Sequence, residues 1–95
     1  MSELTRLRSK IDIIDRRLVK LLNQRLATVG RIGTWKAERG LASYSPKRSA
    51  EILCNVCTAN AGPSTAGQLR RIYRQIIAAS VQLQSKQRSA RRKGK

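Results

Sequence analysis

Apolar residues recur three or four positions apart through the first third of the chain. The series comprises Leu4, Leu7, Ile11, Ile14, Leu18, Leu21, Val29 and Ile32. This spacing places them on one face of a long α-helix. Ser2 is a suitable N-cap and Gly40 a stop signal, so we predict a helix from Ser2 or Leu4 to about Arg39. At ~1.5 Å per residue it would be ~50 Å long, too long to fold back on one small domain.

The same periodicity predicts two shorter helices. Ser45 followed by Pro46 is typical of an N-cap and a first helical residue, and this helix should run to about Ala59. Residues 60–63 read Asn-Ala-Gly-Pro, which indicates a turn. The third helix is predicted to begin near Ser64 or Thr65 and to run to about Gln84 or slightly beyond. Because β-branched alternation is absent, the sequence predicts an all-α fold with three helices per chain, one of them very long.

Charge separates the chain into two parts. Residues 1–84 carry fifteen Lys and Arg against five acids, whereas residues 85–95 carry six cations and no acid. We expect residues 1–84 to form one helical domain and residues 85–95 to be a disordered basic tail without a dedicated partner. A contact between the tail and a nucleic acid or an acidic surface is the alternative. A domain this small buries limited apolar surface, so the long apolar stripe indicates helix pairing between chains.

The two cysteines do not indicate a metal or redox site. Cys54 and Cys57 form a C-x-x-C inside a predicted helix, without the strand-turn-helix context of a redox motif. The chain has no His and no second Cys pair, so a zinc site would lack ligands. We expect two small, partly buried core residues and no metal. The segment Met1–Lys10 has no apolar run typical of a secretory signal, and no segment reaches membrane-spanning length, which predicts a cytoplasmic protein.

Three cations lie where the long helix should be apolar. Arg25 and Lys36 continue the apolar stripe, and Arg8 lies at its edge. A buried cation is costly unless it is paired, and the chain has only five acids, so we predict an anionic ligand. Arg25 and Lys36 share a face with Cα atoms ~16 Å apart, but Arg8 is ~25 Å from Arg25 along the helix. Antiparallel pairing of two chains would bring Arg8 of one to the other two, forming two equivalent sites.

Several motifs occur together in one family. The segments LRSKIDIIDRRLVKLLNQRLATVGRIGTWK, SPKR, GP and IYRQIIAASVQLQ resemble the all-helical chorismate mutases over about residues 4–84. The specific elements are L-R-x-x-I-D-x-I-D, L-L-x-x-R and a lysine eleven residues after that arginine. The resemblance implies an intertwined homodimer in which each active site uses residues of both protomers. It also implies the cofactor-free conversion of chorismate to prephenate, in aromatic amino acid biosynthesis.

The resemblance implies a role for each matching residue. Arg8 from the partner protomer and Arg25 would bind the two substrate carboxylates, as bidentate guanidinium groups do. Lys36 and Gln84 would donate to the ether oxygen, on which negative charge develops in the transition state. The catalyst must also hold the compact diaxial conformer of the substrate. Gln84, unlike a glutamate, stays a donor at any ordinary pH.

The match is incomplete around the second helix. Arg48 and Ser80 match pocket residues, but the family's usual glutamate, which accepts a hydrogen bond from the ring hydroxyl, is replaced by Ser49. An acidic residue often found four positions earlier is replaced by Ser45, which can cap the helix and present its N–H. Glu51 lies roughly 200° around the helix from Ser49 and should point elsewhere. We therefore expect a mutase weakened by roughly ten- to a hundredfold.

Two other functions stay open at this point. An isochorismate-pyruvate lyase of the same fold could dispense with the glutamate that Ser49 replaces. A catalytically degenerate regulatory or nucleic-acid-binding module would account for Ser49 and for the basic tail. Only three aromatic residues occur, however, which is unfavourable for stacking on single-stranded nucleic acid.

Overall fold

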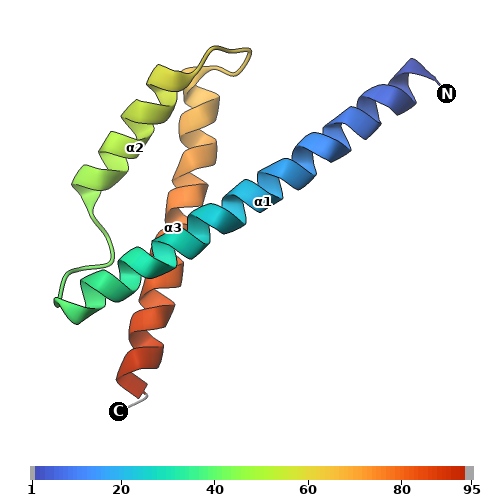
Figure 1. Ribbon diagram of the computed structural model, residues 1–95. Helices are drawn as coiled ribbons and strands as arrows, with labels where there is room; N and C mark the ends of the chain where they lie inside the picture. The colour runs from blue at the N-terminus through green and yellow to red at the C-terminus, as the bar shows by residue number, and fades with distance from the viewer. Residues whose placement is uncertain (1, 94–95) are drawn as a thin grey trace.

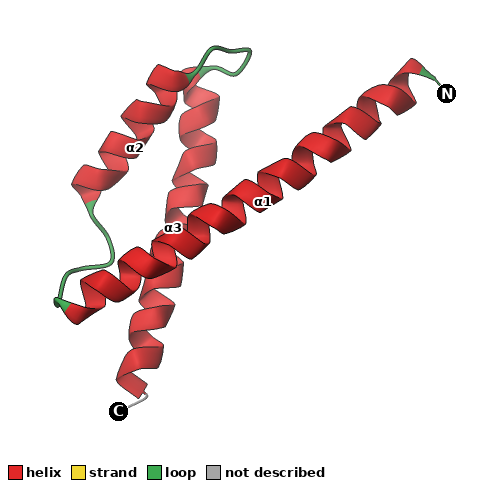
Figure 2. Ribbon diagram, viewed as in Figure 1, coloured by secondary structure: helices red, strands yellow, loops and turns green. Residues whose placement is uncertain are grey.

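The computed structural model describes residues 2–93, and side chains as far as Arg91. It contains the helices α1 (Glu3–Glu38), α2 (Pro46–Ala59) and α3 (Ala66–Lys93), and the described residues include no strand (Figure 2). The predicted all-α class with three helices is confirmed. None of the helices in residues 2–93 is long and apolar enough to span a membrane.

The helix ends follow local capping chemistry. Ser2 Oγ accepts a hydrogen bond from the N–H of Thr5 at 3.1 Å, which satisfies one free donor at the start of α1. After Arg39, Gly40 adopts a φ of +68°, a conformation that glycine reaches without steric cost and that ends the helix. Ser45 Oγ caps α2 by the same chemistry as Ser2, as the sequence predicted.

The third helix begins with a reciprocal cap. The N–H of Gln68 donates to Thr65 Oγ1 at 3.1 Å, and the N–H of Thr65 donates to Gln68 Oε1 at 2.9 Å. Two donors at the helix start are thereby satisfied by two side chains.

The prediction of a disordered tail is wrong for residues 85–93. Helix α3 does not end near Gln84 but continues to Lys93. No Gly or Pro interrupts this segment, and the side chains of Gln87 and Arg88 bond back to the rest of the chain. Residues 94–95 of the predicted tail lie outside the described residues.

The chain is elongated rather than compact (Figure 1). Helices α1 and α2 each pack against α3, and within residues 2–93 they do not pack against each other. The N-terminal part of α1 projects beyond α3 (Figure 1). The exposed residues 3–24 are called the arm. The radius of gyration is 17.1 Å, whereas a compact domain of this length has about 12 Å.

Very little of the single chain is buried. Among residues 2–91 only Gly33, Ile77, Ser80 and Gln84 are buried. Every residue of the arm is exposed, including the apolar stripe residues Leu4, Leu7, Ile11, Ile14, Leu18 and Leu21. The accessible surface is 7647 Å², compared with about 5,500 Å² for a folded monomer of this mass. The apolar stripe is therefore not covered within one chain.

Candidate active site

One pocket forms where the C-terminal half of α1, the start of α2 and the middle of α3 meet. Its volume is ≈ 130 Å³. The apolar wall consists of Val29, Ile32, Ile52, Ile77 and Val81. The polar lining consists of Arg25, Lys36, Ser43, Ser45, Arg48, Ser49, Ser80 and Gln84. Seven of these eight polar residues are site residues predicted from the sequence, and the fold brings them together from all three helices.

Positive charge dominates the pocket. Arg25, Lys36 and Arg48 line it, and none of its lining residues is acidic. Arg25 Nη1 donates to Ser80 Oγ, and the Ser80 hydroxyl donates to the carbonyl of Ile76 at 3.0 Å. Ser80 is buried and Arg25 half-buried, so this pair fixes the guanidinium at the pocket wall. Such a site suits a small ligand with more than one carboxylate.

Gln84 is buried in the pocket but only weakly held. Its Nε2 donates to the carbonyl of Val29 at 3.4 Å, a long hydrogen bond, and its Oε1 has no partner within the described structure. Gly33 of α1 lies against it, because a Cβ at Gly33 would come within 2.9 Å of Gln84 Cγ. The missing side chain of Gly33 therefore permits the close approach of α1 and α3 that places Gln84 in the pocket.

The start of α2 uses its polar groups locally. Ser45 Oγ accepts the N–H of Arg48 at 3.2 Å, and Arg48 Nη1 lies 3.4 Å from Glu51 Oε2 in an exposed ion pair. Ser49 is half-buried and lines the pocket, whereas Glu51 is exposed and does not. Glu51 therefore does not supply the carboxylate that Ser49 lacks.

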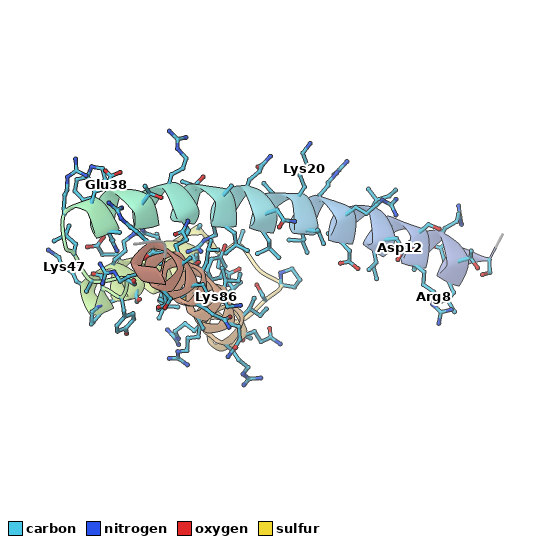
Figure 3. The ribbon with its side chains drawn as sticks, turned by 90° about the horizontal axis from the view of Figure 1, so that it is seen from below. Arg8, Asp12, Lys20, Glu38, Lys47 and Lys86 are labelled. Carbon is cyan, nitrogen blue, oxygen red and sulfur yellow. The ribbon has the colours of Figure 1, made fainter. Side chains whose placement is uncertain are left out.

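Arg8 is the one predicted site residue that lies away from this pocket. It is exposed near the free end of α1 (Figure 3). The pocket is formed by the opposite half of that helix. Within one chain Arg8 cannot contribute to the pocket, as the spacing along the helix predicts.

Some features of the site were missed or misjudged. Ser43 lies in the α1–α2 loop, where periodicity gives no signal, and nothing in the sequence singles it out. Cys57 is half-buried as expected, but Cys54 is exposed, so its assignment as a partly buried core residue is wrong. It lines a hollow between α2 and Arg70 of α3.

Comparison with known proteins identifies relatives along most of the chain. Residues 7–85 match the family described as chorismate mutase type II. A bifunctional chorismate mutase/prephenate dehydratase from Aquifex aeolicus is 37% identical over 90 residues, which cover 90% of this chain and 25% of that protein. The T-protein of Enterobacter agglomerans is 42% identical over 55 residues, covering 58% of this chain and 15% of the relative. The chain thus spans a quarter or less of the length of these relatives.

Solved structures extend the likeness to the fold. A structure of chorismate mutase (Form II) from Thermus thermophilus has a TM-score of 0.88 and 32% sequence identity, covering 90% of this chain and 98% of that one. The Form I structure from the same organism has a TM-score of 0.81 at 33% identity, covering 83% of this chain and 99% of that one.

Proposed function

Because the chain belongs to the chorismate mutase type II family, we propose that it catalyses the rearrangement of chorismate to prephenate. The family resemblance inferred from the sequence is confirmed. The observation that carries the proposal is the pocket itself, which combines three cations and a buried carboxamide with no acid. Chorismate presents two carboxylates and one ether oxygen, and these groups complement that lining.

The reaction is an intramolecular, concerted shift, so binding and charge stabilisation provide the catalysis. We assign Arg25, fixed by Ser80, to one carboxylate, which it can hold through two parallel hydrogen bonds. Lys36 donates to a carboxylate and to the ether oxygen. Gln84 has a second N–H besides the one directed at Val29, and that weak bond leaves the carboxamide able to turn toward the ether oxygen. When substrate binds, Arg48 leaves its ion pair with Glu51 and binds the substrate instead.

The residues that line the pocket offer no charged hydrogen-bond acceptor to the ring hydroxyl of chorismate. Ser49 lines the pocket at the position where the resemblance to the family implies a glutamate. A neutral hydroxyl replaces a charged acceptor, and a hydrogen bond to a charged group is worth about 1.5–3 kcal/mol. We therefore propose a working but weak mutase, slower by roughly ten- to a hundredfold in catalytic efficiency.

The proposed enzyme is a homodimer paired through the arm. The apolar stripe of the arm is exposed, and the single chain has about 2,000 Å² more accessible surface than a folded monomer of its mass. Two chains that each buried this excess would bury about 4,000 Å² in total, which lies within the range of about 2,000–5,000 Å² typical of obligate dimers. Antiparallel pairing of two arms would bring Arg8 of one protomer to the pocket of its partner and complete each site.

Turnover of chorismate by the purified chain tests the proposal. We expect prephenate to form faster than in the uncatalysed reaction, and Lys36→Ala to abolish that gain. Lys20→Ala is the matched control, because Lys20 is an exposed lysine of the same helix outside the pocket. Pyruvate and salicylate formed from isochorismate, without prephenate from chorismate, would instead identify a lyase. No turnover of either substrate at high enzyme concentration would reduce the pocket to a binding site.

A further inference from the structure

The last two turns of α3 lie beyond the part of the chain that matches the family. The match ends at residue 85, and α3 continues to Lys93. In this extension Lys86 and Arg91 are exposed, but Gln87 and Arg88 are half-buried. The segment therefore has a face that is covered by the rest of the chain.

Both half-buried side chains bond to α1 or to the loop after it. Gln87 Nε2 donates to the carbonyl of Gly30 at 3.2 Å, one turn of α3 beyond Gln84. Arg88 donates from its guanidinium to the carbonyl of Leu41. A charged donor on a backbone carbonyl is among the stronger hydrogen bonds in proteins.

Leu41 belongs to the α1–α2 loop, which is held by little else. Its own hydrogen bonds close it onto the end of α1: Gly40 N–H to Ala37 O at 3.2 Å and Leu41 N–H to Lys36 O at 2.9 Å. Within residues 2–91, Arg88 provides the sole hydrogen bond from α3 to residues 40–44. The loop then carries Ser43 onto the pocket wall.

We propose that Arg88 is a positioning residue that fixes the α1–α2 loop beside the pocket, so that the α3 extension controls how well the site is formed before ligand binds. The extension restrains the loop through two hydrogen bonds. Gln87 holds α3 against α1 through the carbonyl of Gly30, and Arg88 links α3 to the loop through the carbonyl of Leu41. This inference rests on the proposed function for its kinetic consequence, but the restraint on the loop is independent of it. Without the hydrogen bond from Arg88, the loop must become ordered when the ligand binds, and the lost conformational entropy weakens the affinity.

Two measurements on the same variants test whether Arg88 restrains the loop. Arg88→Ala removes the donor, Arg88→Lys keeps a donor that can reach one carbonyl, and Arg91→Ala removes an exposed cation one turn later. Limited trypsin digestion reports on the loop through the bond after Arg39, where the loop begins. Steady-state kinetics with chorismate report on the site.

We expect Arg88→Ala to accelerate cleavage after Arg39 and to raise KM about three- to tenfold with kcat nearly unchanged, since a half-exposed charged hydrogen bond is lost. Arg88→Lys should bring the cleavage rate and KM most of the way back to the wild-type values, and Arg91→Ala should leave both at the wild-type values. Equal behaviour of Arg88→Ala and Arg91→Ala in cleavage and KM would overturn the proposal. If the wild type does not turn over chorismate, the proposed function fails, and the digestion alone decides whether Arg88 restrains the loop.

Discussion

Gly33 offers a direct test of how closely α1 and α3 approach at the pocket. It is buried, and an added Cβ would clash with Gln87 Oε1 and lie 2.9 Å from Gln84 Cγ. The carboxamide of Gln87 can rotate away, but it then loses its hydrogen bond to the carbonyl of Gly30. Gln84 Cγ cannot, because it is one bond from a Cβ fixed on α3, so its movement displaces the carboxamide or the helix.

The size of the effect follows from two opposing contributions. Replacing glycine by alanine inside a helix stabilises it by about 1 kcal/mol. Overpacking a close contact costs about 1–3 kcal/mol. Gly33→Ala should therefore lower the free energy of unfolding by about 0–2 kcal/mol. Displacement of the Gln84 donor should lower kcat by at least about tenfold, because removing one such donor outright costs ~10²–10³.

Gly30→Ala is the matched control on the same helix. Its added Cβ would lie 3.2 Å from the mobile end of Gln87 and 4.0 Å from Leu83 Cδ2, which small adjustments can accommodate. We expect this variant to be as stable as the wild type or more stable, with kcat little changed. Urea denaturation at one fixed protein concentration and kinetics with chorismate provide the comparison. If Gly33→Ala were stabilised as much as Gly30→Ala and kept its kcat, the inferred close approach would be wrong.

Three other substitutions address the remaining parts of the site. Gln84→Glu should make kcat fall as pH rises, because only the protonated carboxyl can donate to the ether oxygen; a pH profile as flat as that of the wild type would argue against a Gln84 donor. Ser49→Glu should raise catalytic efficiency about tenfold or more, and an unchanged value would mean that the ring hydroxyl is bound elsewhere. Arg8→Ala and Arg25→Ala should each be nearly inactive, yet an equal mixture allowed to exchange subunits should recover about 25% of wild-type activity, since half the dimers would then hold one intact site; no recovery would contradict sites shared between protomers.

The sequence predicted the helices from short-range patterns, whereas most of the pocket residues were assigned through the resemblance to the chorismate mutases. Apolar spacing, the Ser2 and Ser45 caps and Gly40 determine α1 and α2 locally, and these two helices begin and end close to the predicted residues. Arg25 and Lys36 were recognisable because a cation on an apolar stripe needs a partner. These signals operate within one helix and require no knowledge of how the helices pack.

The features that were missed depend on contacts between distant parts of the chain. Residues 85–95 look like a tail because their composition is basic. The helix over residues 85–93 depends on the bonds of Gln87 and Arg88 to α1 and its loop, which composition does not reveal. Ser43 has no pattern of its own and reaches the pocket through the path of the loop. Composition describes the surface that a segment presents, but not the partner that it meets.

The few residues that the single chain buries have a consequence for how this protein can change. Of the four, Ser80 and Gln84 line the pocket, Ile77 forms part of its wall, and Gly33 supports Gln84. Selection for substrate and selection for folding therefore act on the same positions. Residues 2–91 of a single chain offer such a pocket no separate interior to absorb the strain of accepting a different molecule. A change in specificity would therefore first require a stabilising change elsewhere, such as in the proposed contact between subunits.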